Sequence, residues 1–154
     1  MSDPATHTVP DPESWAAENS ANCCGIFADL GESPDLMRTD PVAGLRRIES
    51  GLAEGWAPRE LDSEEWVRFS SFLLIVLAEF LISCHGARWG WLTDPSSPLG
   101  GRWVLVGFPH LLGRETGPVD VGQIVQDARS GDDVSLIALV DRAEAESGMR
   151  VLSG

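Results

Sequence analysis

The stretch FLLIVLAEFLI, residues 72–82, decides the fold of this chain. It is apolar nearly all round, which is typical of a helix buried in the core of a domain. Its eleven residues include Glu79, whereas a membrane span needs roughly 20 apolar residues. The stretch therefore predicts the central helix of a globular domain.

The signals at both ends of this helix are clear. Asp62 and Glu65 have the spacing of a capping box, with Asp in place of the usual Ser or Thr. Gly86 is suited to the C-cap, since glycine tolerates a left-handed backbone. The predicted helix runs from about residue 63 to about residue 84. Its expected buried side chains are Phe72, Leu73, Val76, Leu77 and Phe80.

Two tryptophan-rich segments follow the helix. ARWGWL at 87–92 and GRWVLVGF at 101–108 show the alternation of β-strands, and TDPSSPLGG at 93–101 is dense in turn formers. A hairpin or meander is the simplest arrangement, with residues 110–112 as a possible third strand. We expect a small antiparallel sheet of two or three strands.

Helices flank the predicted sheet in the sequence. Asp40 and Pro41 predict the start of a helix before the central one, and Asp120 with Gln123 begins the first helix after the sheet. A last helix is expected from Asp132 or Asp133 to near residue 148. Helices, then strands, then two C-terminal helices indicate an α+β domain.

The N-terminal part is expected to differ from the rest. Residues 1–11 are polar and rich in proline, and a short helix is predicted from Pro12 to about Ala21. The sequence NCCGIFADLGESPD predicts an irregular connection after it. We therefore divide the chain into an N-terminal tail and irregular arm, 1–35, and a single α+β domain, 36–154.

The charge of the chain restricts its partners. There are 24 acidic side chains and 11 basic ones. Every basic one is Arg, and the net charge is -13. Such a surface repels nucleic acid and anionic membranes and favours a basic protein partner. Surplus carboxylates are expected near residues 29–35 and 132–146. A polar N-terminus and three cysteines, an odd number, favour a cytoplasmic, reducing location.

Residues 70–145 resemble small uncharacterised bacterial α+β families of the immunity or accessory-protein type. The resemblance is carried by Gly86, Trp89, Gly90, Gly101 and Trp103, and by VDVGQIVQDARSGDDVSLIAL at 119–139, with Gly131, Ser135 and Leu136 at matching places. It implies a helix that enters a small sheet through a glycine turn, and an immunity or accessory protein encoded beside other genes. It implies no catalytic residues.

The tryptophans of the predicted strands form the candidate binding surface. Trp89 and Trp91 share one face of a strand, and pairing across the hairpin adds Trp103. This face either packs on the central helix or contacts a partner. Arg102, Asp132 and Asp133 are the charged candidates for the same contact.

Three residues of the central helix carry chemistry. Glu79 lies within the apolar run, so it needs a partner such as Arg88, Arg102 or an indole N–H, or must stay protonated. Cys84 lies at the negative end of the helix dipole, which disfavours a thiolate, and His85 suits that end as a cation. We predict a structural Cys84, no metal site and no cofactor.

The sequence is compatible with two functions. The leading hypothesis is a small acidic protein that binds a protein partner as an immunity, adaptor or accessory factor. The alternative is an enzyme or small-molecule-binding protein with a pocket between sheet and helices, using Glu79, Cys84, His85 or Arg102. The sequence carries no signal for an oligomeric state.

Overall fold

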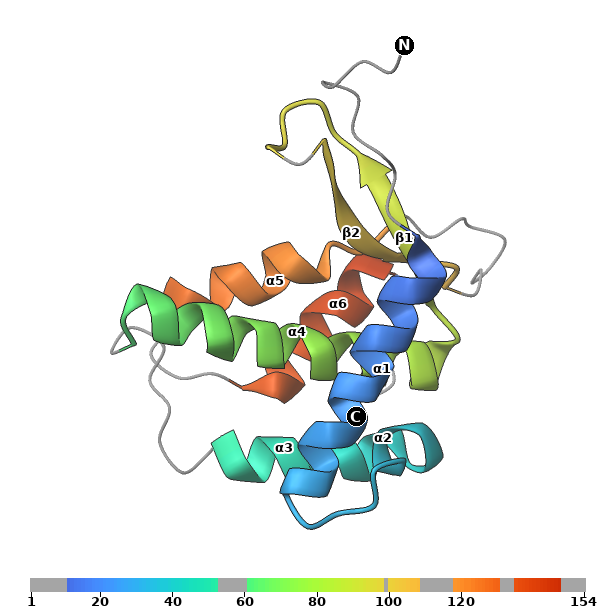
Figure 1. Ribbon diagram of the computed structural model, residues 1–154, viewed down its shortest axis with the longest axis vertical. Helices are drawn as coiled ribbons and strands as arrows, with labels where there is room; N and C mark the ends of the chain where they lie inside the picture. Colours follow the sequence, from blue (N-terminus) through green and yellow to red (C-terminus); the bar gives the residue numbers. More distant parts are fainter. Residues whose placement is uncertain (1–10, 53–60, 99, 109–117, 131–134, 148–154) are drawn as a thin grey trace.

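The computed structural model describes residues 11–52, 61–98, 100–108, 118–130 and 135–147. Within them, helices pack with a two-stranded antiparallel sheet, and α5 and α6 follow the sheet in the chain, so the predicted α+β class is confirmed (Figure 1). The helices are α1 (Pro12–Asp29), α2 (Leu36–Thr39), α3 (Pro41–Leu52), α4 (Ser63–His85), α5 (Val121–Asp127) and α6 (Leu136–Ser147), with a 3-10 turn at Ala128–Ser130. The strands are β1 (Arg88–Thr93) and β2 (Gly101–Val106).

Helix α4 is the centre of the fold and has the predicted ends. The Asp62 carboxylate accepts from the Glu65 N–H at 2.8 Å, and the Glu65 carboxylate accepts from the Asp62 N–H at 3.2 Å. Gly86 ends the helix in the left-handed conformation, with φ of 73°. Four of the five expected core side chains are fully buried: Leu73, Val76, Leu77 and Phe80. Phe72 is only half-buried.

Helix α1 is longer than the sequence predicts. The expected irregular connection from Asn22 is wrong as far as Asp29, because the helix continues to that residue. Asn19, Cys23 and Phe27 recur every four residues and turn one side of α1 into the core. The helix lies across α4 and reaches β1 (Figure 1). Burial of that side against α4 stabilises a helix that its local sequence supports only weakly.

The two strands pair in one register, with Trp91 opposite Trp103 and Trp89 opposite Leu105. Gly101 is required by this pairing, since a Cβ at that position would come within 2.6 Å of the Trp91 indole ring. The possible third strand at 110–112 lies outside the described residues. An isolated bridge joins Leu105 to Val119 and leads the chain into α5.

The C-terminal helices close the side of α4 that faces away from α1 (Figure 1). Asp120 caps α5, as predicted, by accepting from the Gln123 N–H at 3.0 Å. The predicted start of the last helix at Asp132 or Asp133 lies outside the described residues. Helix α6 receives a cap from another helix, because the Glu49 carboxylate of α3 accepts from the Ile137 N–H at 3.0 Å. This hydrogen bond fixes α6 against α3.

Candidate binding groove

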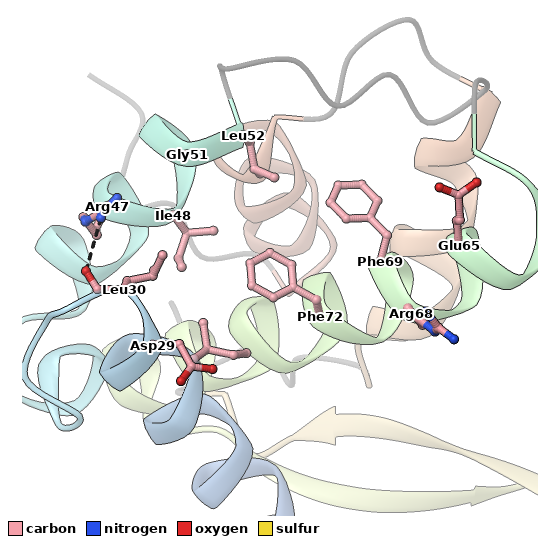
Figure 2. A pocket seen from close by; sticks show the side chains of 11 residues that line it. Asp29, Leu30, Arg47, Ile48, Gly51, Leu52, Glu65, Arg68, Phe69 and Phe72 are labelled. Carbon is pink, nitrogen blue, oxygen red and sulfur yellow. Dashed lines mark hydrogen bonds between the residues drawn. The ribbon is translucent and has the colours of Figure 1, made fainter.

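A groove of about 550 Å³ lies between the end of α1, the second half of α3 and the first half of α4 (Figure 2). Its walls are mainly apolar. The lining residues are Ile26, Asp29, Leu30, Arg47, Ile48, Gly51, Leu52, Glu65, Arg68, Phe69 and Phe72. The volume is within the roughly 300–1,000 Å³ typical of ligand sites, so the groove has room for several apolar groups.

The floor of the groove follows from helical spacing. Glu65, Arg68, Phe69 and Phe72 are related by three, four and seven residues and therefore share one side of α4. The rings of Phe69 and Phe72 lie 6.3 Å apart and nearly parallel. Apolar side chains of α3 face these rings across the groove (Figure 2).

Leu30 lines the groove at the end of α1 and is unusual among the apolar residues because its side chain is exposed. It is 37% exposed, and Leu30 and Val67 are the two exposed large hydrophobic side chains in the described ranges. Leu30 follows the last residue of α1 and precedes Gly31, whose φ of 78° turns the chain. The fold thus presents an apolar side chain to solvent at the mouth of an apolar groove.

Charged side chains surround the apolar floor. The Arg47 guanidinium binds Glu32 at 3.1 Å and donates to the Leu30 carbonyl at 3.4 Å. The Arg68 guanidinium binds Glu64 at 3.0 Å, in a pair that is 78% exposed on both sides. Both arginines therefore already have acidic partners, and Asp29 and Glu65 leave the rim with a surplus of negative charge.

The tryptophans predicted as a binding surface mostly form a cluster inside the fold. Trp89 is 4% exposed, and Trp103 is half-buried against the core. Trp15 of α1 stacks on Trp103 with centroids 4.9 Å apart and meets Trp89 edge-on at 5.7 Å. Half-buried Trp91 contacts Trp103 at 5.3 Å. The cluster attaches α1 to the hairpin, and sequence reasoning had not included Trp15 in it.

Of the charged candidates, the structure describes Arg102, which lies away from the groove. Arg102 binds Asp120 at 2.9 Å and Asp94 at 3.7 Å, so it links the hairpin to the start of α5. Asp132 and Asp133 lie outside the described residues. Arg102 therefore contributes to the contact between sheet and helices, and it does not line the groove.

Glu79 has a different neighbour from those expected. Burial raises the pKa of its carboxyl, and the guanidinium of Arg38 on α2 opposes that rise. The sequence had suggested Arg88, Arg102 or an indole, and no hydrogen bond from any of them to Glu79 is found in the described part of the chain. Burial and the Glu79 carboxylate together raise the pKa of the Cys23 thiol to about 12. This polar cluster lies where α1, α2 and α4 meet.

His85 forms a buried side-chain hydrogen bond that sequence reasoning missed. Its Nε2 lies 2.8 Å from Glu144 Oε2, and the two side chains are 1% and 0% exposed. The expectation that Glu144 belongs to an acidic surface is wrong. The spacing in the sequence does predict burial of Glu144. Leu136, Val140 and Glu144 are four residues apart on α6 and so share its apolar side. Burial and Glu144 also raise the pKa of the Cys84 thiol.

The residues proposed for an enzyme pocket lie in several parts of the fold. Glu79 lies beside Arg38, His85 is paired inside the core, and Arg102 lies on the hairpin. These three and Cys84 are absent from the lining of the groove. In the described ranges, no group of three or more His, Cys, Asp and Glu side chains is arranged to hold a metal ion.

Comparison of the chain with protein-family models, curated proteins and solved structures found no match.

One helix in the described ranges is long and apolar enough to cross a membrane by length and composition alone. It is α4, and 44% of its most apolar 18 residues lie buried inside the fold. A central helix of a packed domain has the same length and composition, so this property gives α4 no membrane role by itself.

Proposed function

We propose that this protein acts by binding a protein partner, in an immunity, adaptor or accessory role, and that the groove between α1, α3 and α4 is its contact surface. The observation that carries the proposal is the exposed Leu30 at the mouth of an apolar groove. Apolar surface left in water favours association, because covering it releases roughly 25 cal/mol per Å².

The charge of the chain supports the same proposal. A net charge of -13 favours approach of a basic protein. Two acids and two arginines line the groove, and both arginines already pair with acids outside the lining. The three cysteines are free, which agrees with our proposal of a cytoplasmic location.

A matched pair of variants tests the groove. Leu30→Asp places a charge at the groove, whereas Val67→Asp places one on α4 at the other exposed large hydrophobic residue, outside the groove. A photo-reactive amino acid at position 30 should crosslink a partner in the native host, and the same group at position 67 should not. Leu30→Asp should abolish capture of that partner, and Val67→Asp should retain it. Equal capture by both variants would rule the groove out.

The volume of the groove favours one other candidate, a small apolar ligand. Native mass spectrometry of the protein purified from its host separates the two functions. A bound small molecule that is lost in Leu30→Asp would support the ligand, and its absence together with a position-specific crosslink would support the partner.

A further inference from the structure

The two surplus carboxylates of the groove lie at its opposite ends. Asp29 is beside Leu30 at the end of α1, and Glu65 is in the first turn of α4, with Phe72 and Phe69 between them (Figure 2). A segment that lies along the apolar floor would therefore pass one acidic group at each end, of which Glu65 also accepts from the Asp62 N–H. It would also pass Arg47 and Arg68, which already pair with acids outside the lining. Basic residues at both ends of that segment would complement Asp29 and Glu65.

Asp29 conflicts with the local electrostatics of its own helix. It is the last residue of α1, where the helix dipole is negative and a carboxylate is unfavourable. The last turn of α1 has no basic residue, and Asp29 is exposed, with no hydrogen bond or ion pair from its carboxylate to the described residues. A residue that breaks a stabilising rule without compensation is expected at functional sites. Asp29 is thus suited to a charge that arrives with the partner.

In the part of the chain that the structure describes, helices form the walls of the groove. Its lining residues belong to α1, α3, α4 and the residue that follows α1, whereas β1 and β2 lie elsewhere. Helical backbone groups are already hydrogen-bonded, so these walls offer no strand edge for an extended peptide to pair with. A segment that satisfies its own backbone hydrogen bonds, which means a helix, fits such walls best.

We propose that the groove receives an amphipathic α-helix of a partner protein, with an apolar side against Phe69, Phe72 and Leu30 and basic residues that meet Asp29 and Glu65. This inference rests on the proposed function and names the chemistry of the partner segment. Apolar anchors spaced three, four and seven residues apart would lie along the groove.

Three labelled synthetic peptides test the proposal by fluorescence anisotropy. The first is an amphipathic helix of Leu and Lys, the second replaces every Lys by Glu, and the third keeps the Leu/Lys composition in an order that removes the helical period. The unmodified protein should bind the first peptide clearly more tightly than the other two. Failure to bind the first, or equal binding of either control peptide, overturns the proposal.

Variants then locate the binding. Asp29→Asn combined with Glu65→Gln should weaken the Leu/Lys helix on the order of two- to thirtyfold, as expected for two partly exposed charge pairs. Glutamine at position 65 still supports the cap of α4. Glu18→Gln removes one charge from the exposed side of α1, outside the groove, and should change affinity less than twofold.

The same variants separate the two proposals. If Leu30→Asp weakens the peptide and the double charge variant does not, the basic helix is wrong and the apolar groove remains the contact. If the Leu/Lys helix binds Leu30→Asp as tightly as it binds the unmodified protein, it binds elsewhere and this inference is wrong. The crosslinking test of the groove is independent of either result.

Discussion

Glu79 is the residue whose protonation should matter most for the pH dependence of stability. Burial raises the pKa of its carboxyl above the ordinary value of 4.5. The folded state therefore holds this proton more tightly than the unfolded state, and the stability contributed by the protonated group is lost as the pH rises through the folded pKa.

Glu79→Gln removes the loss of stability that comes from ionising a buried carboxyl, because the amide stays neutral. We expect the free energy of unfolding of the variant, minus that of the unmodified protein, to increase as the pH rises from about 4 to 7. Urea denaturation at several pH values measures this difference, with Glu18→Gln on the exposed side of α1 as the control. A difference that shrinks with rising pH would show that Arg38 outweighs burial.

The three cysteine thiols should differ sharply in reactivity. Cys23 is 3% exposed, and burial with the Glu79 carboxylate raises the pKa of its thiol to about 12; burial and Glu144 raise the pKa of Cys84. Because the thiolate is the reactive form, half-buried Cys24 should be alkylated first and Cys23 last. Peptide mass spectrometry after timed iodoacetamide treatment at neutral pH gives the order. Early labelling of Cys23 would mean that α1 detaches from the core.

The buried hydrogen bond between His85 and Glu144 should contribute more to stability than an exposed ion pair. Glu144→Ala leaves His85 buried without this partner, which should cost about 1–3 kcal/mol. Glu64→Ala breaks the exposed pair with Arg68 and should cost less than about 1 kcal/mol. Chemical denaturation of both variants measures the contrast. Similar small losses from both would contradict a buried pair.

At the scale of elements, α4 was predictable and α1 was only partly so. The capping box, the apolar run and Gly86 are local signals, and they give both ends of α4 correctly. Helix α1 contains Gly25 beside two cysteines and has little amphipathic character, so its local sequence predicts an irregular segment there. Its helical form depends on packing against α4, which local propensity does not contain.

The groove could not be predicted for a related reason. Phe72 and Leu30 have the same apolar character as core residues, so their exposure depends on how three helices are placed. The excess of acid near residues 29–35 was predicted, and Asp29 and Glu32 do lie at or beside the rim. Composition gave the charge of the site, and only the packed helices gave its shape.

Helix α4 should account for much of the stability of the domain. Leu77 is fully buried, and Leu77→Ala should reduce the free energy of unfolding by about 2–5 kcal/mol through lost burial and a cavity. Val67→Ala on the same helix is the control, since Val67 is 62% exposed and should change stability by less than about 0.5 kcal/mol. A loss below that value at Leu77 would mean that α4 is a surface element.

At the scale of the whole molecule, charge should govern how fast a partner arrives. The net charge of -13 attracts a basic segment over a distance that shrinks to about 10 Å at 0.1 M salt. The association rate of the Leu/Lys helix should therefore fall steeply with ionic strength, while its dissociation rate changes less. Stopped-flow fluorescence measures both rates. An association rate that is flat with salt would exclude electrostatic attraction.

Helix α6 is held at both ends by partners that are distant in the chain. Glu49 caps its start from 88 residues away, and His85 pairs with its last turn from 59 residues away. Closing such long loops is slow and entropically costly, so we expect these two contacts to form late in folding. Substitutions at Glu49 or His85 should then leave the folding rate nearly unchanged and accelerate unfolding. We therefore expect the two contacts to determine the lifetime of the native state more than its rate of formation.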